Sequence, residues 1–302
     1  MDLKSKIILI YGPTASGKSE FAIKLAKKIK GEIINTDSMQ VYKDLKILTA
    51  RPLKKNLFKI KHHLYGFQNS NKNFSTGEWL KLATKKINEI KKRKKTPILV
   101  GGTGLYFKAL TDGLVQIPSI PLTFRNKVRR LQKNLGQEKF HKKLLKIDPL
   151  TINQINPKDV QRSIRAYEVK MFTNKSIIKW YKNTKPAYKK KDFYKIMINY
   201  PRHLLVEKIY IRARSMLEMG AILEVKKFIN LKISKEKTIS KAIGISEIKD
   251  FLKKIADKEE IANKISIKTR QYAKRQMTWA RGHMIGWKKI NPNRLDNFLK
   301  KI

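Results

Sequence analysis

The chain has 302 residues, of which 41% are hydrophobic and 9% aromatic, enough to bury the core of one large domain or two ordinary ones. It contains no cysteine, which excludes disulfides and cysteine-ligated zinc, and no apolar run approaches the roughly 20 residues of a membrane-spanning helix. We therefore expect a soluble, cytoplasmic protein. The net charge of +47, from 70 basic against 23 acidic residues, favours a polyanionic partner such as nucleic acid, although lysine bias of the whole genome would also decorate every solvated face.

The first third of the chain alternates between short apolar runs and helical patterns. Residues 6–11 predict a buried parallel strand, and a helix follows from about Gly17, with Gly31 placed to end it. The pattern continues with a strand at 32–36, an amphipathic helix at 76–94 and a strand that begins at 96 and runs into a glycine turn. Such alternation is typical of an α/β fold with a parallel sheet, whose strand ends open on one edge where ligands sit.

The pattern changes after Pro118. Residues 121–197 are mostly helical in pattern and rich in lysine and arginine, with breaks at Asp148-Pro149 and near Pro186. Helical periodicity returns from Leu204. Since the segment GPTASGKS at 12–19 also has the P-loop pattern, we predict a P-loop NTPase-like α/β core formed by residues 1–120 and 198–302, with C-terminal helices, and a helical insertion domain at 121–197.

The segment GPTASGKS follows the first strand and opens the first helix, which is the context of a phosphate-binding P-loop. Its backbone amides and lysine predict binding of a di- or triphosphate, with Mg²⁺ on the serine hydroxyl. The motif does not establish ATP as that ligand. The predicted diphosphate-binding residues are Gly12, Pro13, Thr14, Ala15, Ser16, Gly17, Lys18 and Ser19.

Two polar residues follow the other strands at the same predicted edge. The strand that ends at Val100 continues in glycines and not in the aspartate that organises magnesium in nucleotide-hydrolysing P-loop proteins. Asp37 is the acidic residue at a strand end near the P-loop. It is either a turn residue or a base or magnesium-linked group, and its position beside a phosphate cradle favours the second interpretation. Thr103 lies across the same edge, unless its hydroxyl only bonds its own turn.

Two basic segments allow both a structural and a functional interpretation. Arg162 and Arg165 lie one helical turn apart, on a solvated face or facing a ligand. In TRQYAKRQMTWARG, a stripe of Ile265, Tyr272 and Trp279 favours packing on one face, which leaves the other free to bind nucleic acid. Adjacent His62 and His63 point apart on any regular element, so we predict no metal site there; the remaining histidines, His141, His203 and His283, stand alone and receive no role.

Taken together, these segments resemble the bacterial tRNA dimethylallyltransferases, also called tRNA isopentenyltransferases. The resemblance rests on motifs that occur in the family's order along almost the full chain: GPTASGKS at 12–19, DSMQVY at 37–42, HHL at 62–64, GGTGLYFKAL at 101–110, DP at 148–149, NPKDVQRSIRAYEV at 156–169, RARSMLEMG at 212–220 and TRQYAKRQMTWARG at 269–282. The departures are TARP at 49–52 for TAKP, Asn174 for a glycine, and the loss of a tyrosine from the family's G-Y-x-E at 244–247.

The resemblance implies that the P-loop holds dimethylallyl diphosphate, whose dimethylallyl group passes to N6 of the adenine 3′ of the anticodon. It implies Asp37 as the base that orients and deprotonates the amine, Thr103 as its support, Lys18 and Arg212 as charges that stabilise the leaving diphosphate, and Mg²⁺ on Ser19. Gln40 and Tyr42 are the nearest candidates to touch bases. Contacts with the anticodon stem-loop of tRNA are expected at Asp37, Ser38, Met39, Gln40, Thr103, Gln161, Arg162, Ser163, Ile164, Arg165, Arg270 and Lys274.

Two alternatives remain at this stage. A small-molecule or nucleoside kinase would use the P-loop for ATP and the insertion as a lid, with Arg162 and Arg165 over the phosphates. A non-catalytic RNA-binding protein would retain the P-loop as a relic, although intact Lys18, Ser19 and Asp37 argue against it. No apolar surface stripe is left over, so we expect a monomer, and we expect no membrane partner.

Overall fold

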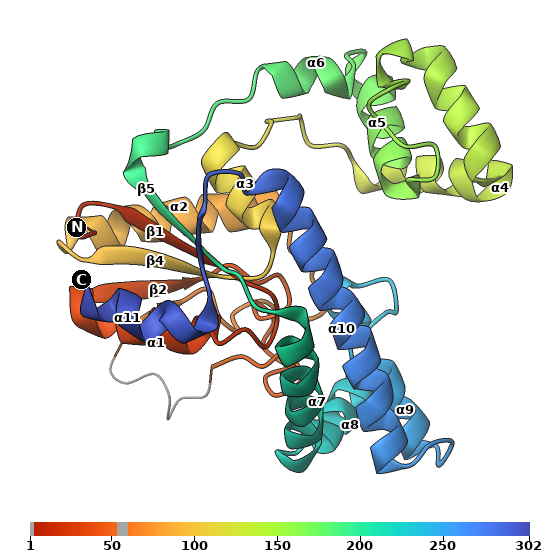
Figure 1. Ribbon diagram of the computed structural model, residues 1–302. Coiled ribbons are helices and arrows are strands. Elements are labelled where there is room, and N and C mark those ends of the chain that lie inside the picture. Colours follow the sequence, from red (N-terminus) through yellow and green to blue (C-terminus); the bar gives the residue numbers. More distant parts are fainter. Residues whose placement is uncertain (1–2, 53–59) are drawn as a thin grey trace. The chain divides into compact units, whose positions relative to one another are not determined.

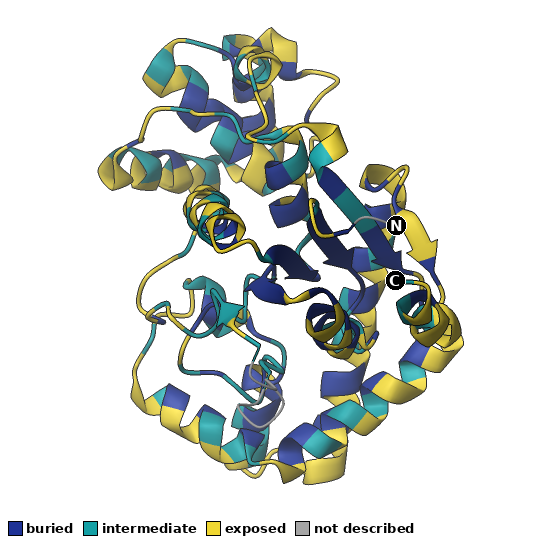
Figure 2. Ribbon diagram, turned by 90° about the vertical axis from the view of Figure 1, so that its left-hand side faces the viewer, coloured by how far each residue is buried: buried dark blue, intermediate teal, exposed yellow. Residues whose placement is uncertain are grey.

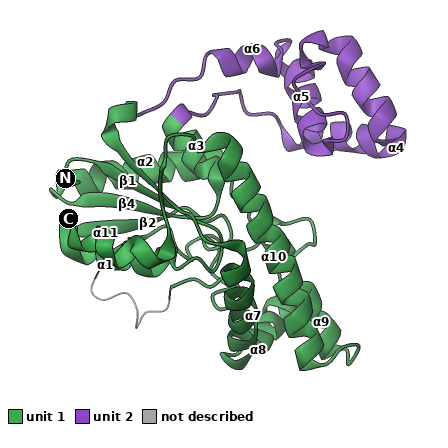
Figure 3. Cartoon of the chain, viewed as in Figure 1, with its two compact units in different colours: residues 1–111, 188–302 green, residues 112–187 purple. Residues whose placement is uncertain are grey.

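The computed structural model describes residues 3–52 and 60–302 and divides the chain into two compact units (Figure 3). One unit comprises residues 1–111 and 188–302, and the other comprises residues 112–187. The predicted boundary at 197 is wrong, because the strand Phe193–Ile198 pairs with the first strand of the sheet and belongs to the α/β unit. The second unit also begins earlier, at 112 instead of 121.

The larger unit contains a parallel sheet (Figure 1). Among the described residues it has six strands, which are β1 (Ile7–Tyr11), β2 (Gly31–Asn35), β3 (His62–His63), β4 (Thr96–Gly101), β5 (Phe193–Ile198) and β6 (Lys288–Ile290). They lie in the order β3-β2-β4-β1-β5-β6, and each paired neighbour is parallel. The predicted α/β class is therefore confirmed, and β1, β2 and β4 end on one edge of the sheet, as expected.

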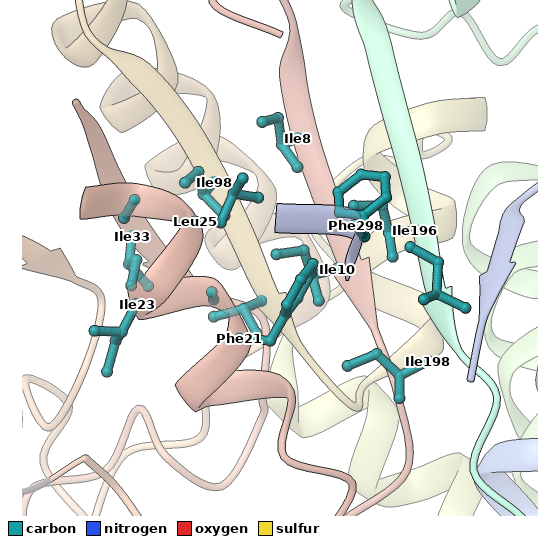
Figure 4. Packing of buried hydrophobic residues seen from close by; sticks show 14 of the residues in the cluster. Ile8, Ile10, Phe21, Ile23, Leu25, Ile33, Ile98, Ile196, Ile198 and Phe298 are labelled. Atoms are coloured by element: carbon teal, nitrogen blue, oxygen red, sulfur yellow. The ribbon is translucent and has the colours of Figure 1, made fainter. Parts of the chain in front are cut away.

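The alternation of β1 distributes its side chains over two hydrophobic layers. Ile8 and Ile10 face the helices α1 (Lys18–Ile29), α7 (Arg202–Glu218) and α11 (Leu295–Lys300). Figure 4 shows Phe21 and Leu25 of α1 among these strand residues. The side chains of Ile7, Leu9 and Tyr11 pack instead with α2 (Thr76–Lys92), α3 (Gly104–Asp112) and the C-terminal part of α10 (Lys258–His283). Both faces of the sheet are thus covered, so the central strands β1, β2 and β4 are buried along their whole length (Figure 2).

The end of α1 differs from the prediction. Lys30 adopts the left-handed conformation that caps the helix, with φ 54°, while Gly31 already begins β2 and pairs with Thr96. A side chain at Gly31 would meet Ile98, since an added Cβ would stand 2.6 Å from its Cδ1. The glycine is required for close strand approach and not for the cap.

The C-terminal helices build a second core in the same unit. Helices α7, α8 (Ala221–Asn230), α9 (Ile245–Leu252) and α10 pack around the loop that follows β2, burying Val41, Tyr42, Leu45 and Leu48. Helices α7 and α10 lie side by side (Figure 1). No helix within the described ranges is both long enough and apolar enough to cross a membrane.

The smaller unit is helical, as predicted for the insertion. It contains α4 (Leu122–Ile147), interrupted at Gly136 where φ is 72° and ψ 167°, then α5 (Val160–Thr173) and α6 (Ile177–Lys182). Its own core includes Phe140, Leu144 and Tyr167. Asn174 ends α5 in the left-handed conformation, with φ 54°, in the position where the resembled family has glycine.

The N-terminal end of β2 carries a buried carboxylate, Glu32, which is 1% exposed. Its oxygens lie 2.7 Å from Arg93 Nη2, 2.7 Å from His63 Nε2 and 3.3 Å from Lys95 Nζ. Burial opposes its ionisation, but the hydrogen bonds from these three partners prevail and lower the pKa of Glu32 to about 2.

We predict that this cluster makes stability depend on acid pH. Because the pKa of Glu32 is lower in the folded chain than the ordinary 4.5, its stabilisation is present above that value and is lost as pH falls toward 2. Since Arg93 and Lys95 are partly exposed, we expect about 2 kcal/mol from this group. Urea unfolding of wild type and Glu32→Gln between pH 6 and 2.5 measures it. The difference in the free energy of unfolding between wild type and Glu32→Gln should shrink as the pH falls, and a constant difference would contradict the prediction. Glu89→Gln, which removes a surface ion pair with Lys86, is the control.

Candidate active site

The loops after β1 and β2, the helices α7 and α10 and the segment 241–243 enclose a cavity of about 380 Å³ at the carboxyl edge of the sheet. Its lining combines P-loop residues with Asp37 and its neighbours, and with cations from the C-terminal helices. The polar and charged side chains of the lining include Thr14, Lys18, Ser19, Asp37, Arg212, Tyr272 and Arg275. Three of the eight predicted diphosphate-binding residues, Thr14, Lys18 and Ser19, thus share this cavity with the predicted base.

The P-loop runs from the end of β1 into α1. Ala15 and Gly17 have positive φ, 62° and 76°, which curls the backbone and directs successive amides inward. Lys18 Nζ donates to the carbonyl of Pro13 at 3.1 Å. Burial lowers the pKa of Lys18 to about 8, partly offset by Asp37 and reinforced by Arg212. The buried hydroxyl of Ser16 has no hydrogen-bond partner among the described residues, so the loop retains one polar group without a partner.

A second cavity, of about 620 Å³, borders the other side of the same lysine. It shares Lys18, Ser19 and Arg212 with the first, and adds Lys46 and Arg51. Both cavities are thus lined by cations around the P-loop, an environment suited to a polyanionic ligand.

Asp37 uses one carboxylate oxygen for its own turn and leaves the other free. Oδ1 accepts from the backbone amides of Met39 at 2.9 Å and Gln40 at 3.4 Å. Oδ2 makes no hydrogen bond to a described residue, and the side chain lines the first cavity. Tyr272 lines the same cavity; burial raises its pKa, and the charge of Asp37 raises it further. The structural and catalytic interpretations of Asp37 are therefore compatible.

Thr103 ties the glycine turn to the Asp37 loop. Its Oγ1 accepts from the Ser38 amide at 3.0 Å and lies 3.3 Å from the Ser38 hydroxyl. The hydroxyl thus bonds the neighbouring loop and not its own turn, and it supports the segment that carries Asp37.

Arg212 reaches the P-loop from α7. Its Nη1 donates to the Thr14 hydroxyl at 3.4 Å, and burial lowers its pKa while Asp37 raises it. The predicted catalytic residues Lys18, Asp37 and Arg212 thus interact electrostatically across one cavity.

Sequence reasoning missed three residues of α10. Tyr272 and Arg275 line the cavity, and Gln276, one position further along the same helical face, bonds both the P-loop and the glycine turn. Tyr272 was predicted as core, and Arg275 and Gln276 were not singled out. Their spacing of three and four residues is the signal that could have placed them together.

The residues present suit a magnesium ion bound with a diphosphate. The Ser19 hydroxyl lines both cavities, and Asp37 lines the first. Mg²⁺ prefers such oxygen ligands and keeps several waters, so one hydroxyl and the ligand's phosphate oxygens suffice. Among the described residues no group of three or more histidine, aspartate or glutamate side chains could hold a metal by itself.

The loop after Asp37 is fixed from within the unit. Gln40 Nε2 donates to the carbonyls of Thr49 at 2.9 Å and Ala50 at 3.1 Å. Glu224 of α8 accepts from the amides of residues 46–48 at 2.6 to 3.0 Å. Tyr42 is only 1% exposed and packs in the C-terminal core, so its prediction as a base contact is wrong.

The helical unit presents only part of its predicted surface. Arg162 is exposed and pairs with Asp159 at 3.1 Å, while Arg165 lies 3.4 Å from the buried Glu168; Gln161 is exposed. Ser163 is buried against His141, and Ile164 lies in the core. These two side chains lie on the inward face of α5 and cannot contact RNA. The predicted tRNA contacts of Ser163 and Ile164 are therefore wrong. On α10, Arg270 and Lys274 are exposed.

A model of the IPP transferase family matches residues 40–283. The chain belongs to the IPP transferase family. The tRNA dimethylallyltransferase of Pelagibacter ubique (strain HTCC1062) is 59% identical over 302 residues, which are 100% of this chain and 96% of that protein. The tRNA dimethylallyltransferase of Allorhizobium ampelinum is 40% identical over 287 residues, 94% of each chain.

Solved structures agree with this IPP transferase assignment. A eukaryotic dimethylallyltransferase acting on tRNA matches with a TM-score of 0.84 and 28% identity, over 95% of this chain and 74% of that one. The tRNA isopentenylpyrophosphate transferase of Staphylococcus epidermidis matches with a TM-score of 0.68 and 33% identity, over 98% and 96%. The family resemblance predicted from the motifs is confirmed, and the alternative of a small-molecule or nucleoside kinase is wrong.

Proposed function

We propose that this chain transfers the dimethylallyl group of dimethylallyl diphosphate to N6 of the adenine 3′ of the anticodon in tRNA, releasing diphosphate. The proposal rests on one cavity, in a chain of the IPP transferase family, that is lined by Lys18, Arg212 and Asp37. A cradle with two cations suits a diphosphate leaving group, and a carboxylate opposite it suits a proton acceptor.

The donor side is formed by the P-loop. Its amides, Lys18 and Arg212 would bind the diphosphate and stabilise the charge that grows as the bond between carbon and the bridging oxygen breaks. When bound through Ser19, Mg²⁺ would neutralise part of that charge. Adenine N6 is a weak nucleophile, so most of the acceleration comes from this stabilisation and from holding the amine in line with the breaking bond.

The acceptor side is formed by Asp37. Its oxygen Oδ1 is held by the turn amides, so Oδ2 can accept a hydrogen bond from the amine and then its proton as the new C–N bond forms. Thr103 keeps this loop in place through Ser38. The adenine must leave its stack to enter a cavity at the end of the strands, so we expect base flipping.

Exposed cations supply candidate contacts to the anticodon stem-loop. They are Arg162 on α5 and Arg270 and Lys274 on α10, with the half-buried Arg165 beside them on α5, within a chain of net charge +47. Such side chains bind phosphates, whereas sequence is read from unpaired bases of the loop. We further propose that the protein acts in the cytoplasm and that it is a monomer. A measurement of its mass in solution at assay concentrations tests the oligomeric state.

The test is a transfer assay with unmodified tRNA, Mg²⁺ and radiolabelled dimethylallyl diphosphate, with and without ATP. We expect label on the adenine 3′ of the anticodon without ATP, and no label on tRNA in which that adenine is replaced by guanine. Absence of transfer from this donor, with retained tRNA binding, would overturn the proposal.

A further inference from the structure

We propose that Gln276 is a positioning residue that sets the donor-binding P-loop against the acceptor-binding loops, an inference that rests on the proposed transfer reaction. Gln276 lies on α10 and is 5% exposed. Its side chain bonds two segments more than 170 residues away, the P-loop, whose Thr14 lines the cavity, and the turn after β4. It has no direct access to a substrate and acts through these segments.

The two ends of the Gln276 amide have different tasks. Oε1 accepts from the backbone amide of Thr14 in the P-loop at 2.9 Å. Nε2 donates to the carbonyl of Gly102 in the turn after β4 at 2.9 Å. The helix itself is anchored because the hydroxyl of Tyr11 donates to the Gln276 carbonyl at 2.7 Å. A glutamine is required because these partners demand one acceptor and one donor from the same planar group.

These bonds continue into the catalytic groups on both sides. On the donor side, the Thr14 hydroxyl accepts from Arg212. On the acceptor side, Gly102 directly precedes Thr103, which accepts from the Ser38 amide beside Asp37. Gln276 is therefore the side-chain link between the cradle for the leaving group and the loop that carries the base.

The packing around Gln276 leaves it little freedom. A Cβ added to Gly102 would stand 2.2 Å from Nε2, so the turn approaches the amide as closely as a glycine permits. Tyr272, on the preceding turn of α10, lines the cavity. A displaced Gln276 would thus shift the distance between donor and acceptor, and an error of about 1 Å in that geometry can reduce a rate on the order of 10²-fold.

The substitution Gln276→Glu separates the two bonds. A carboxylate still accepts from the Thr14 amide but cannot donate to Gly102, so the acceptor side should loosen while the P-loop stays in place. We expect kcat to fall on the order of 10²-fold, with the affinity for inorganic diphosphate, measured by calorimetry, within about threefold of wild type. Gln276→Met removes both bonds, and it should lower kcat and also weaken diphosphate binding. Gln271→Glu, an exposed glutamine on the same helix, is the matched control.

Three results would overturn the proposal: wild-type kcat for Gln276→Glu, equal losses of kcat and diphosphate affinity in both variants, or an effect of Gln271→Glu of the same size. If Gln276→Glu does not fold, Gly102→Ala presses on Nε2 from the other side and should give the same selective loss of kcat. Hydrogen exchange of the Thr14 amide in the Gln276→Met variant gives a readout independent of transfer. If wild type transfers no dimethylallyl group but the Thr14 amide loses protection in Gln276→Met, the proposed reaction is wrong and the positioning role of Gln276 is retained. Unchanged protection of the Thr14 amide in Gln276→Met would overturn the positioning role.

Discussion

Replacing Asp37 by asparagine should reduce dimethylallyl transfer on the order of 10²–10⁴-fold while leaving tRNA affinity nearly unchanged. The asparagine carbonyl can still accept from the Met39 and Gln40 amides, so the turn survives. What is lost is the basic oxygen that faces the cavity. Single-turnover transfer with saturating tRNA measures the chemical step, and filter binding measures the affinity.

Two controls separate the base from the loop. Asp44→Asn lies in the same loop, where Asp44 Oδ2 accepts from the Ser70 hydroxyl at 2.6 Å, and should retain transfer. Asp37→Ala loses both the base and the turn, so it should additionally weaken tRNA binding. Transfer at wild-type rates by Asp37→Asn would remove Asp37 from the role of base.

The parallel sheet and its active edge were predictable because their signals are local. β1 is a short apolar run followed by Gly12, and β4 is one that ends at Gly101; such runs form buried strands in parallel sheets. Parallel strands end on the same side, so the P-loop, Asp37 and Thr103 had to meet. The chemistry of the edge therefore followed from the motifs and from topology alone.

The departures all depend on contacts that are distant in sequence. β5 follows a run of lysines and itself contains Tyr194 and Lys195. Only its pairing with β1 identifies it as a strand of the sheet. Tyr42 follows polar motif residues, yet it is buried by helices of which the first begins only at Arg202. Gln276 carries no charge, and its four-residue spacing from Tyr272 indicates only a shared helical face and not its partners, which lie 262 and 174 residues away.

The helical unit shows the limit of reading an exposed face from spacing. Arg162 and Arg165 do lie one turn apart, but α5 also turns Ser163 and Ile164 toward the core. A motif of consecutive residues on a helix cannot present all its side chains to one ligand. The buried carboxylate of Glu168 lies 3.4 Å from both Arg165 and Arg125. This cluster could not be predicted, because only the fold brings the two arginines together.

Replacing Lys18 by methionine should reduce kcat/KM for dimethylallyl diphosphate on the order of 10²–10³-fold. The lysine lies in the wall shared by both cavities, and its charge is the part of the P-loop that backbone amides cannot replace. Steady-state transfer at varied donor concentration measures the effect. Lys81→Met, which removes an exposed charge from α2, should change little, and an equal loss there would show that net charge alone is responsible.

The same lysine should make donor binding depend on pH above neutrality. Burial lowers the pKa of free Lys18 to about 8, and only the protonated amine offers a charge to the diphosphate. Bound diphosphate stabilises that proton, so donor affinity is highest below pH 8 and should fall by up to tenfold per unit as pH rises above it. Calorimetric binding of diphosphate between pH 6.5 and 9.5 checks this. The slope should disappear in Lys18→Met, whose affinity is low at every pH; if the slope persists there, the titrating group is a different one in the cradle.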